Sequence, residues 1–272
     1  MTPFSPLLEG RTALVIGASA GIGRQIGLRL AAGGVEVAFH GRRRDRLDEA
    51  VAEAGGGVTV VAELESAEAC ASAVAEAVAH LGHIDLLVYA ASASRLSLVQ
   101  DTSAAEWTKV FTTNVIAPAL VARAAIPHLT PGGISAFISS ESVGMPYHGL
   151  IPYGSSKAAL EEVVRGLRLE HPELRFSCIR VGQTGPTDFA RDFDPALAGE
   201  LLPKWIAIGR MPANAMDVTE LGCAIADTIT VNLAAPSIEM QDLVIRAPGG
   251  PFMGPASSIL EDLDASRESG AT

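Results

Sequence analysis

The chain has 272 residues and a formal net charge of −11. Hydrophobic residues make up 48% of it and charged residues 19%, which supplies a large core and excludes wholesale disorder. A surface this acidic repels phosphate groups, so we expect neither nucleic acid nor an anionic membrane as a partner.

Short β-branched runs alternate with alanine-rich stretches of helical spacing along most of the chain. The predicted strands are residues 12–16, 35–39, 58–61, 84–89, 134–139, 175–181 and 243–246. The first predicted helix follows the first strand and ends at residue 30. The others cover residues 47–54, 67–80, 104–128 (bent near Pro118), 153–170 and 218–229. Apolar strands that alternate with helices predict an α/β fold, a doubly wound parallel sheet with helices on both faces.

No composition break divides the chain, so residues 1–272 are predicted to form a single domain. The alternation fails in residues 183–215, which are rich in prolines and aromatic side chains. A long irregular insert of this kind is either a lid over a substrate or a plain surface loop. The acidic tail, residues 255–272, is expected to fray.

Three dispersed cysteines, Cys70, Cys178 and Cys223, form neither a disulfide framework nor a zinc pattern. They fit a reducing cytoplasm, and the first ten residues lack the pattern of a signal peptide. No apolar run approaches the length of a membrane span, and no metal motif is present. We therefore expect a cytoplasmic protein without a membrane segment or a metal.

A glycine-rich turn, Gly17-Ala-Ser-Ala-Gly21-Ile-Gly23, joins the first predicted strand to the first helix. Glycines permit a tight turn and the close approach of a pyrophosphate, which the helix N-terminus then stabilises. A tight turn without a ligand is the alternative, but the position after the first strand favours a phosphate site.

The end of the second strand is where a dinucleotide-binding chain selects its cofactor. An acidic residue there would hold the ribose 2′-hydroxyl of NAD. Here the chain reads His40-Gly41-Arg42-Arg43-Arg44, with three guanidinium groups and no carboxylate. Arginine matches a 2′-phosphate through charge-assisted hydrogen bonds, so the sequence favours NADP over NAD. The alternative, a solvated basic start of a helix, is disfavoured by the helix dipole.

Tyr153 and Lys157 are four residues apart in a helical pattern and therefore share one helix face. A phenol has a pKa near 10, too high for a base at neutral pH, and an adjacent ammonium lowers that pKa. The pair is suited to proton exchange with an alcohol or carbonyl oxygen. The alternative is a surface contact between a tyrosine and a lysine.

Over about residues 8–250 the chain resembles the short-chain dehydrogenase/reductase family, in its compact single-domain, Rossmann-like branch. The glycine loop and the Tyr-x-x-x-Lys pair match the family's motifs. The family's catalytic serine, thirteen residues before the tyrosine, falls on Ser140, and its helix asparagine on Asn114. Because the glycine after the serine comes one residue late, Ser142 remains a second candidate.

The resemblance implies a role for each of these residues. Tyr153 would donate a proton to the substrate oxygen in reduction and accept it in oxidation. Lys157 would lower the pKa of Tyr153 and hold the nicotinamide ribose. Ser140 would hydrogen bond to the carbonyl, and Asn114 would hold a water that connects Lys157 to solvent.

The resemblance also implies which residues contact the dinucleotide. They are Gly17, Ser19, Ala20, Gly21, Ile22, Gly23, Arg42, Arg43, Glu63, Leu64, Ala90, Ala91, Asn114, Tyr153, Lys157, Val181, Thr184 and Thr187. The chain departs from the family where Asn-Asn-Ala-Gly is Tyr89-Ala-Ala-Ser92, so polar bracing is expected to be lost there. It also departs where Pro-Gly is Val181-Gly182 and the following threonine comes one residue late.

The implied activity is an NADP-dependent oxidoreductase that interconverts a ketone or aldehyde and an alcohol by hydride transfer. Its partner would be a small-molecule substrate, and the family suggests a homodimer or homotetramer. The altered segment 89–92 motivates an alternative, a non-catalytic nucleotide-binding or regulatory protein that kept the fold. A lyase or isomerase on the same scaffold is a weaker possibility.

Overall fold

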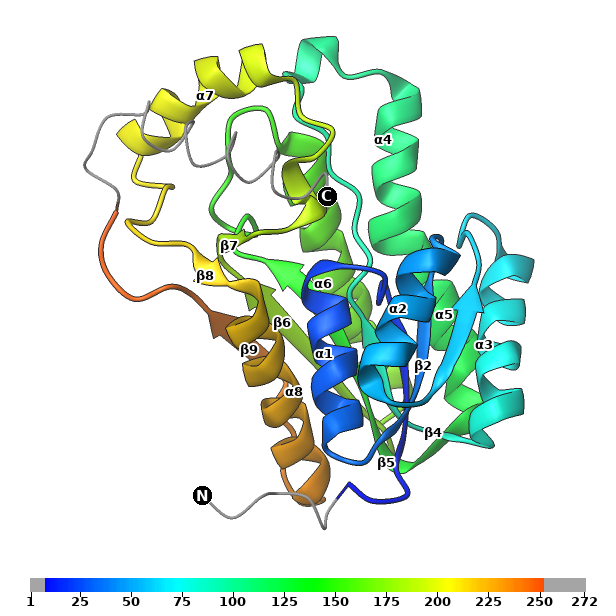
Figure 1. The fold of residues 1–272 in the computed structure, drawn as a ribbon. Coiled ribbons are helices and arrows are strands. Elements are labelled where there is room, and N and C mark those ends of the chain that lie inside the picture. Colours follow the sequence, from blue (N-terminus) through cyan, green and yellow to red (C-terminus); the bar gives the residue numbers. More distant parts are fainter. Residues whose placement is uncertain (1–7, 252–272) are drawn as a thin grey trace.

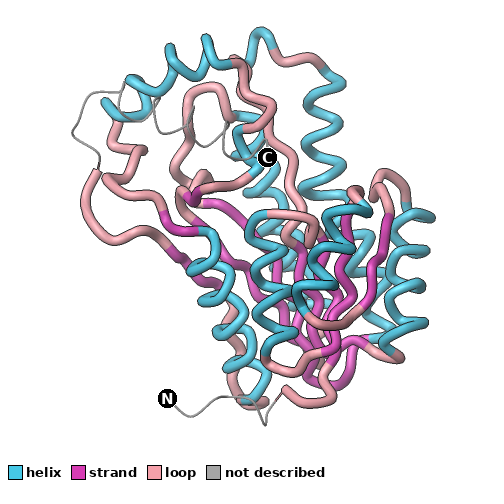
Figure 2. Tube along the Cα trace, viewed as in Figure 1, coloured by secondary structure: helices cyan, strands magenta, loops and turns pink. Residues whose placement is uncertain are grey.

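A seven-stranded parallel sheet forms the centre of the molecule, in a computed structural model that describes residues 8–251 (Figures 1 and 2). Its strand order is β3-β2-β1-β4-β5-β6-β9. These strands are β1 Thr12–Ile16, β2 Glu36–Gly41, β3 Val58–Val61, β4 Ile84–Tyr89, β5 Leu129–Ser140, β6 Arg175–Val181 and β9 Asp242–Ile245. The order reverses between β1 and β4, where such sheets bind their ligands.

Helices cover both faces of the sheet (Figure 2). They are α1 Gly21–Ala32, α2 Arg44–Ala54, α3 Ala67–Leu81, α4 Ala104–Phe111, α5 Ala117–Ala125, α6 Ile151–Glu170, α7 Pro195–Ala207 and α8 Val218–Ala234. Side chains alternate along each strand, so one face packs on α1, α2 and α8 and the other on α3, α5 and α6. Along β1, for example, Val15 belongs to the first core, while Leu14 and Ile16 belong to the second. The predicted α/β fold is confirmed.

The segment 183–215 differs from the predicted irregular chain because it contains the thirteen-residue helix α7. Asp194 caps this helix by accepting a hydrogen bond from the backbone N–H of Ala196, and Pro195 occupies its first position. A proline there is favourable because its missing N–H has no helical partner. Two short strands, β7 Thr184–Gly185 and β8 Met216–Asp217, pair at the two ends of the segment. The single domain stays a prediction, and the tail 255–272 lies outside the described residues.

The predicted helix 104–128 is interrupted, not simply bent at Pro118. A π-helical turn, Thr112–Ile116, joins α4 to α5, and a short 3₁₀ turn follows α5. Pro118 has no N–H to donate to the carbonyl of Asn114 four residues earlier, which explains the departure from α-helical bonding here.

This helical run, Ala104–His128, is also long and apolar enough to cross a membrane by length and composition alone. The prediction that no apolar run approaches that length is therefore wrong. The finding is weak evidence for a span, because core helices pass the same test, and α5 packs its buried side chains on α3 and the sheet.

A buried carboxylate ties the amino ends of the strands together. Asp85 in β4 accepts hydrogen bonds from the Thr12 N–H (3.0 Å), the Arg11 guanidinium (2.8 Å) and the Thr130 hydroxyl (2.9 Å). Burial raises the pKa of Asp85, but these three hydrogen bonds together hold that pKa below its ordinary value.

We expect Asp85→Ala to lower the free energy of unfolding at pH 7 by about 3 kcal/mol, because it leaves buried donors without an acceptor. A lowered folded-state pKa stabilises the fold above the ordinary carboxyl pKa, and this stabilisation is lost as the pH falls through the folded value. Urea unfolding of wild type and variant should therefore differ less at acid pH. Asp48→Ala is the control, since the Asp48 carboxylate also accepts a hydrogen bond, from the Thr59 hydroxyl, but lies at the surface. A difference that is the same at every pH would contradict this account of Asp85.

Candidate active site

The carboxyl ends of β1, β4, β5 and β6 bring the predicted site residues to one edge of the sheet. The chain from β7 to α7 lies over this edge (Figure 1).

The glycine loop packs tightly on the chain that follows β4. Gly17 has φ +87°, and a Cβ on it would lie 2.6 Å from the backbone N of Ala91. A Cβ on Gly23 would lie 2.4 Å from the carbonyl oxygen of Gly17. The N–H groups of Gly17 and Ala18 both donate to the carbonyl of His40. These two glycines are therefore required by close backbone packing.

The start of α1 provides a cradle for an anion. No side chain caps the helix at Ala20, and its first turn holds no acidic residue. A Cβ on Gly21 would meet nothing closer than the Thr187 side chain at 4.0 Å, so this side of the loop is open. Helix N–H groups and the helix dipole favour a phosphate at such a position, and the residues present fit a pyrophosphate.

Two arginines follow β2 and lie in different surroundings. The Arg42 side chain is 63% exposed, and its guanidinium is 3.9 Å from the Glu63 carboxylate. Arg43 donates to the Ser19 hydroxyl (3.2 Å) and pairs with Asp188 (2.9 Å) from the segment over the site. Arg42 is thus the less engaged of the two cations.

The floor beside the glycine loop is apolar. Ala91 and Leu64 pack against the second core, and the Ala90 N–H donates to the Ile16 carbonyl. His40 is buried here, with its ring beside the Ala62 backbone, whose hydrogen bond acts to raise the pKa of the ring. Burial lowers the pKa of His40 to about 4, so its ring is neutral at pH 7.

Tyr153, Lys157 and Ser140 converge below the segment that covers the site. Tyr153 and Lys157 lie in α6 and are only 7% and 2% exposed. The Lys157 ammonium donates to the Ile138 carbonyl (2.8 Å) and lies 5.8 Å from the centre of the Tyr153 ring. The Tyr153 hydroxyl is hydrogen bonded with Ser140 at the end of β5 and with Ser92.

Burial raises the pKa of Tyr153 above its ordinary value. The hydrogen bonds from Ser140 and Ser92 act to lower that pKa, and the Glu141 carboxylate acts to raise it. The net direction is opposite to the one that the Tyr-x-x-x-Lys spacing predicts. Burial also lowers the pKa of Lys157, to about 8. At pH 7 the site therefore holds a neutral phenol beside a mostly protonated amine.

The geometry favours Ser140 over Ser142 as the serine beside the tyrosine. The Ser140 hydroxyl accepts a hydrogen bond from the Ser142 N–H (3.2 Å) and bonds with Tyr153. The Ser142 hydroxyl is buried and has no partner in the part of the chain that the structure describes.

Asn114 lies in the π-helical turn and connects three parts of the site. Its amide donates to the Ala93 carbonyl (2.8 Å) and to the Ser156 hydroxyl (2.9 Å). Its oxygen accepts from the Ala93 N–H (2.8 Å) and the Ser92 hydroxyl (3.3 Å). These contacts supply polar bracing at Ser92, where it was expected to be lost. Both amide hydrogens are engaged, so the predicted water would need another atom of Asn114.

The segment over the site covers Tyr153 directly. Phe189 packs edge-on against Tyr153 (ring centres 5.0 Å apart) and against Phe193 (5.3 Å). The Ser94 hydroxyl donates to the Phe189 carbonyl at 2.8 Å. Thr187 lies beside Gly21, whereas the hydroxyl of Thr184 donates to the carbonyl of Gly182 and Val181 pairs with Ser140 in the sheet.

Sequence reasoning missed Ser92, Asp188 and Phe189 as members of the site. The aromatic content of 183–215 was the one signal that pointed to Phe189. Within residues 8–251 no group of three or more His, Cys, Asp or Glu side chains is arranged to hold a metal ion.

Comparison with known proteins gives a consistent result. A family model described as short chain dehydrogenase matches residues 11–197. Gluconate 5-dehydrogenase of Gluconobacter oxydans is 30% identical over 76% of this chain and 82% of that protein. Human dehydrogenase/reductase SDR family member 4 is 34% identical over 70% of this chain and 71% of that protein. A short chain dehydrogenase of Pseudocercospora fijiensis is 37% identical over 61% of this chain. The match covers only 57% of the length of that protein.

Solved structures of similar sequence share the fold. A short chain dehydrogenase from Burkholderia cenocepacia in complex with NADP is 26% identical with a TM-score of 0.76, covering 88% of this chain and 97% of that one. A short-chain dehydrogenase/reductase from Serratia marcescens is also 26% identical, with a TM-score of 0.75 and coverage of 91% and 99%.

Proposed function

Because the chain belongs to the short-chain dehydrogenase/reductase family of oxidoreductases, we propose that it transfers a hydride between NADP(H) and a small carbonyl or alcohol substrate. The observation that carries this proposal is the convergence of Tyr153, Ser140 and Lys157 at one buried point on the edge of the sheet that bears the glycine loop. A bound nicotinamide dinucleotide supplies the hydride, and the protein supplies the proton and the orientation.

The proton chemistry follows from the surroundings of Tyr153. Its pKa lies above the ordinary phenol value, so at pH 7 its hydroxyl carries a proton that it donates to the oxygen of a carbonyl substrate. Ser140 orients that oxygen, and the neighbouring Ser140 and Ser92 hydroxyls act to lower the pKa of Tyr153, which favours the phenolate formed by proton transfer. The nearby Lys157 ammonium stabilises the same charge. The site is thus protonated in advance for reduction.

Other residues hold the dinucleotide in this proposal. The N–H groups at the start of α1 bind the pyrophosphate, since no acidic side chain in the first turn competes with it. Arg42 binds a ribose 2′-phosphate, because its guanidinium is exposed and its contact with Glu63 is long. The Burkholderia cenocepacia structure in complex with NADP supports this choice of cofactor.

We expect Arg42→Asp to weaken NADPH binding by roughly 10- to 100-fold and to change NADH binding by less than about threefold, since hydrogen bonds to charged groups contribute about 1.5–3 kcal/mol. Isothermal calorimetry with NADPH and with NADH measures the ratio of the two dissociation constants. Arg46→Asp is the charge-matched control, because Arg46 lies four residues further along the chain, in α2, and pairs with Glu49 at the surface. An unchanged ratio would remove Arg42 from the cofactor site.

We further propose that residues 183–215 form a lid over the substrate. Phe189 covers Tyr153, and Asp188 joins this segment to Arg43 beside the glycine loop. A substrate reaches the Tyr153 hydroxyl only when Phe189 moves. The apolar ring contacts of Phe189 favour a substrate with an apolar part.

The alternative of a non-catalytic nucleotide-binding protein is weakened by the hydrogen bonds that Asn114 makes to Ser92 and Ala93. NADPH binding without turnover on a broad panel of ketones and aldehydes would favour that alternative. The homodimer or homotetramer stays a prediction, which light scattering tests. The cytoplasmic location also stays a prediction, and it rests on the three unpaired cysteines.

A further inference from the structure

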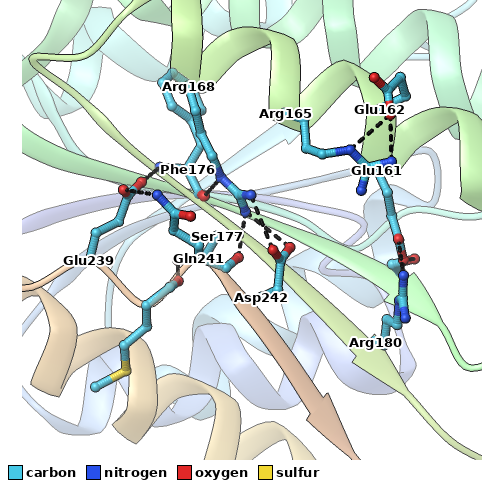
Figure 3. Close-up of polar contacts among 12 residues, drawn as sticks. Glu161, Glu162, Arg165, Arg168, Phe176, Ser177, Arg180, Glu239, Gln241 and Asp242 are labelled. Atoms are coloured by element: carbon cyan, nitrogen blue, oxygen red, sulfur yellow. Dashed lines mark hydrogen bonds and ion pairs between the residues drawn. The ribbon is translucent and has the colours of Figure 1, made fainter.

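A buried carboxylate next to the site has no part in the mechanism above. Glu161 lies one helical turn after Lys157 in α6 and is only 3% exposed. Its carboxylate accepts hydrogen bonds from the Ser139 hydroxyl (2.7 Å) and from two nitrogens of the Arg180 guanidinium, Nε at 2.7 Å and Nη2 at 2.5 Å. Figure 3 shows the Glu161 and Arg180 side chains meeting end to end between α6 and β6.

The sheet register explains why these groups meet. Ser139 in β5 is paired directly with Arg180 in β6, and both lie under α6. The preceding residue of β5, Ile138, accepts the hydrogen bond of Lys157. Two consecutive residues of β5 therefore hydrogen bond to consecutive turns of α6. The Ile138 carbonyl binds Lys157, and the Ser139 hydroxyl binds Glu161.

Several charged or titratable groups face the Lys157 ammonium. Tyr153 and Glu161 come from its own helix, and Cys178 comes from β6, with Arg180 beyond Glu161. β5 contributes the Ile138 carbonyl, and the π-helical turn contributes the uncharged Asn114, bonded to Ser156.

Among these groups Glu161 supplies the negative charge. Burial raises the pKa of the Cys178 thiol to about 12, so Cys178 is neutral at physiological pH. Burial likewise keeps Tyr153 neutral. Burial lowers the pKa of Lys157, and Cys178 and then Glu161 act to raise it. Of these two only Glu161 is charged at pH 7.

We propose that Glu161 is a positioning residue of the active site, whose carboxylate, fixed by Ser139 and Arg180, keeps Lys157 an ammonium on the Ile138 carbonyl. This inference rests on the proposed function for its catalytic meaning, but the electrostatic coupling it describes is a property of the free protein. Glu161 itself does not touch substrate or cofactor, and it acts through Lys157.

The test compares Glu161→Gln with Glu162→Gln. Gln has nearly the shape of Glu and lacks the charge. Glu162 is the next residue of α6, but its side chain is 73% exposed and pairs with Arg165 at the surface, as Figure 3 also shows. Both variants lose one carboxylate from the same helix turn, and only the first loses the buried carboxylate one helical turn after Lys157.

The first readout needs neither substrate nor cofactor. The chain has three lysines, Lys109, Lys157 and Lys204, so ¹³C-labelled lysine side chains yield three NMR signals, assigned with Lys109→Arg and Lys204→Arg. We expect the Lys157 titration midpoint to fall by about one pH unit in Glu161→Gln and by less than about 0.2 in Glu162→Gln. An unchanged midpoint in Glu161→Gln overturns the proposal.

Arg180→Gln provides a second variant, which keeps the test decisive if Glu161→Gln does not fold. It removes the cation that competes with Lys157 for Glu161, so the Lys157 midpoint should rise. A fall of the midpoint in Arg180→Gln would overturn the proposal.

The second readout is the pH profile of NADPH-dependent reduction. Because activity requires the ammonium, Glu161→Gln should lose about tenfold in kcat at a pH above the Lys157 midpoint and stay within about twofold of wild type near pH 6. A purely structural role would lower kcat equally at all pH values. If the lysine midpoints move as expected and no carbonyl is reduced, the coupling stands and the proposed function fails.

Discussion

Replacing Tyr153 by Phe lowers kcat for NADPH-dependent carbonyl reduction by about a thousandfold while the protein keeps its fold. The variant loses the hydroxyl that donates the proton, and a positioned general acid contributes typically 10²- to 10⁴-fold. The ring stays in place between α6 and Phe189, so its packing is preserved. NADPH oxidation with a panel of ketones and aldehydes measures the loss, and calorimetry should show NADPH affinity within about threefold of wild type.

Tyr89→Phe is the matched control. Tyr89 is also a buried tyrosine, and its hydroxyl donates to the Thr113 carbonyl at 2.9 Å. This variant loses one hydrogen bond, which costs about 1 kcal/mol of stability, and should retain most of the activity. If Tyr153→Phe retained full activity on a working substrate, the assigned proton donor would be wrong.

Gly17→Ala is expected to have the largest effect on stability, a loss of roughly 3 kcal/mol or more in the free energy of unfolding. The positive φ of +87° is unfavourable for alanine by about 1–2 kcal/mol. The new Cβ would also lie 2.6 Å from the backbone N of Ala91, and overpacking typically costs a further 1–3 kcal/mol because backbone must shift. Urea unfolding measures the stability, and NADPH binding should weaken because the loop moves.

Gly55→Ala separates the two causes. Gly55 has φ +74° at the end of α2, and a Cβ there would meet nothing within 4 Å. It therefore carries the backbone strain without the collision, and we expect a loss of only about 1 kcal/mol. Equal losses in the two variants would mean that close packing on Ala91 does not explain Gly17.

Local patterns were enough to predict the layers of this fold. Buried parallel strands appear as short apolar runs, and the β1, β3, β4 and β6 ranges agree with the structure at both ends. The helix α7 escaped prediction because prolines mark helix interruptions more often than helix starts. Pro195 begins a helix here, and Pro203 lies inside it.

The membrane expectation failed for a related reason. The run Ala104–His128 is divided by its π-helical turn into pieces that pack differently, yet its length and composition alone meet the criterion for a span. The apolar residues of α5 pack on α3 and on the sheet. This packing exists only in the folded chain, so composition alone does not distinguish it from a membrane span.

Within the site, contacts at short sequence spacing were predictable and contacts across the chain were not. The spacing of four residues placed Tyr153 and Lys157 on one helix face, and the family pattern identified Ser140. Ser92, Asp188 and Phe189 and their partners Arg43 and Tyr153 come from the segments that follow β2, β4, β5 and β6. No local pattern therefore marks these contacts.

The sequence by itself determined the order of the sheet strands and of the helices other than α7, the position of the glycine loop and the pairing of a phenol with an amine one turn away. Only the tertiary structure decided the directions in which the two pKa values shift. Burial under the segment that contains Phe189 raises the pKa of Tyr153, and burial against β5 and β6 lowers that of Lys157. The physical reason is that desolvation depends on everything that packs around a group, whereas a sequence motif records only its neighbours along the helix.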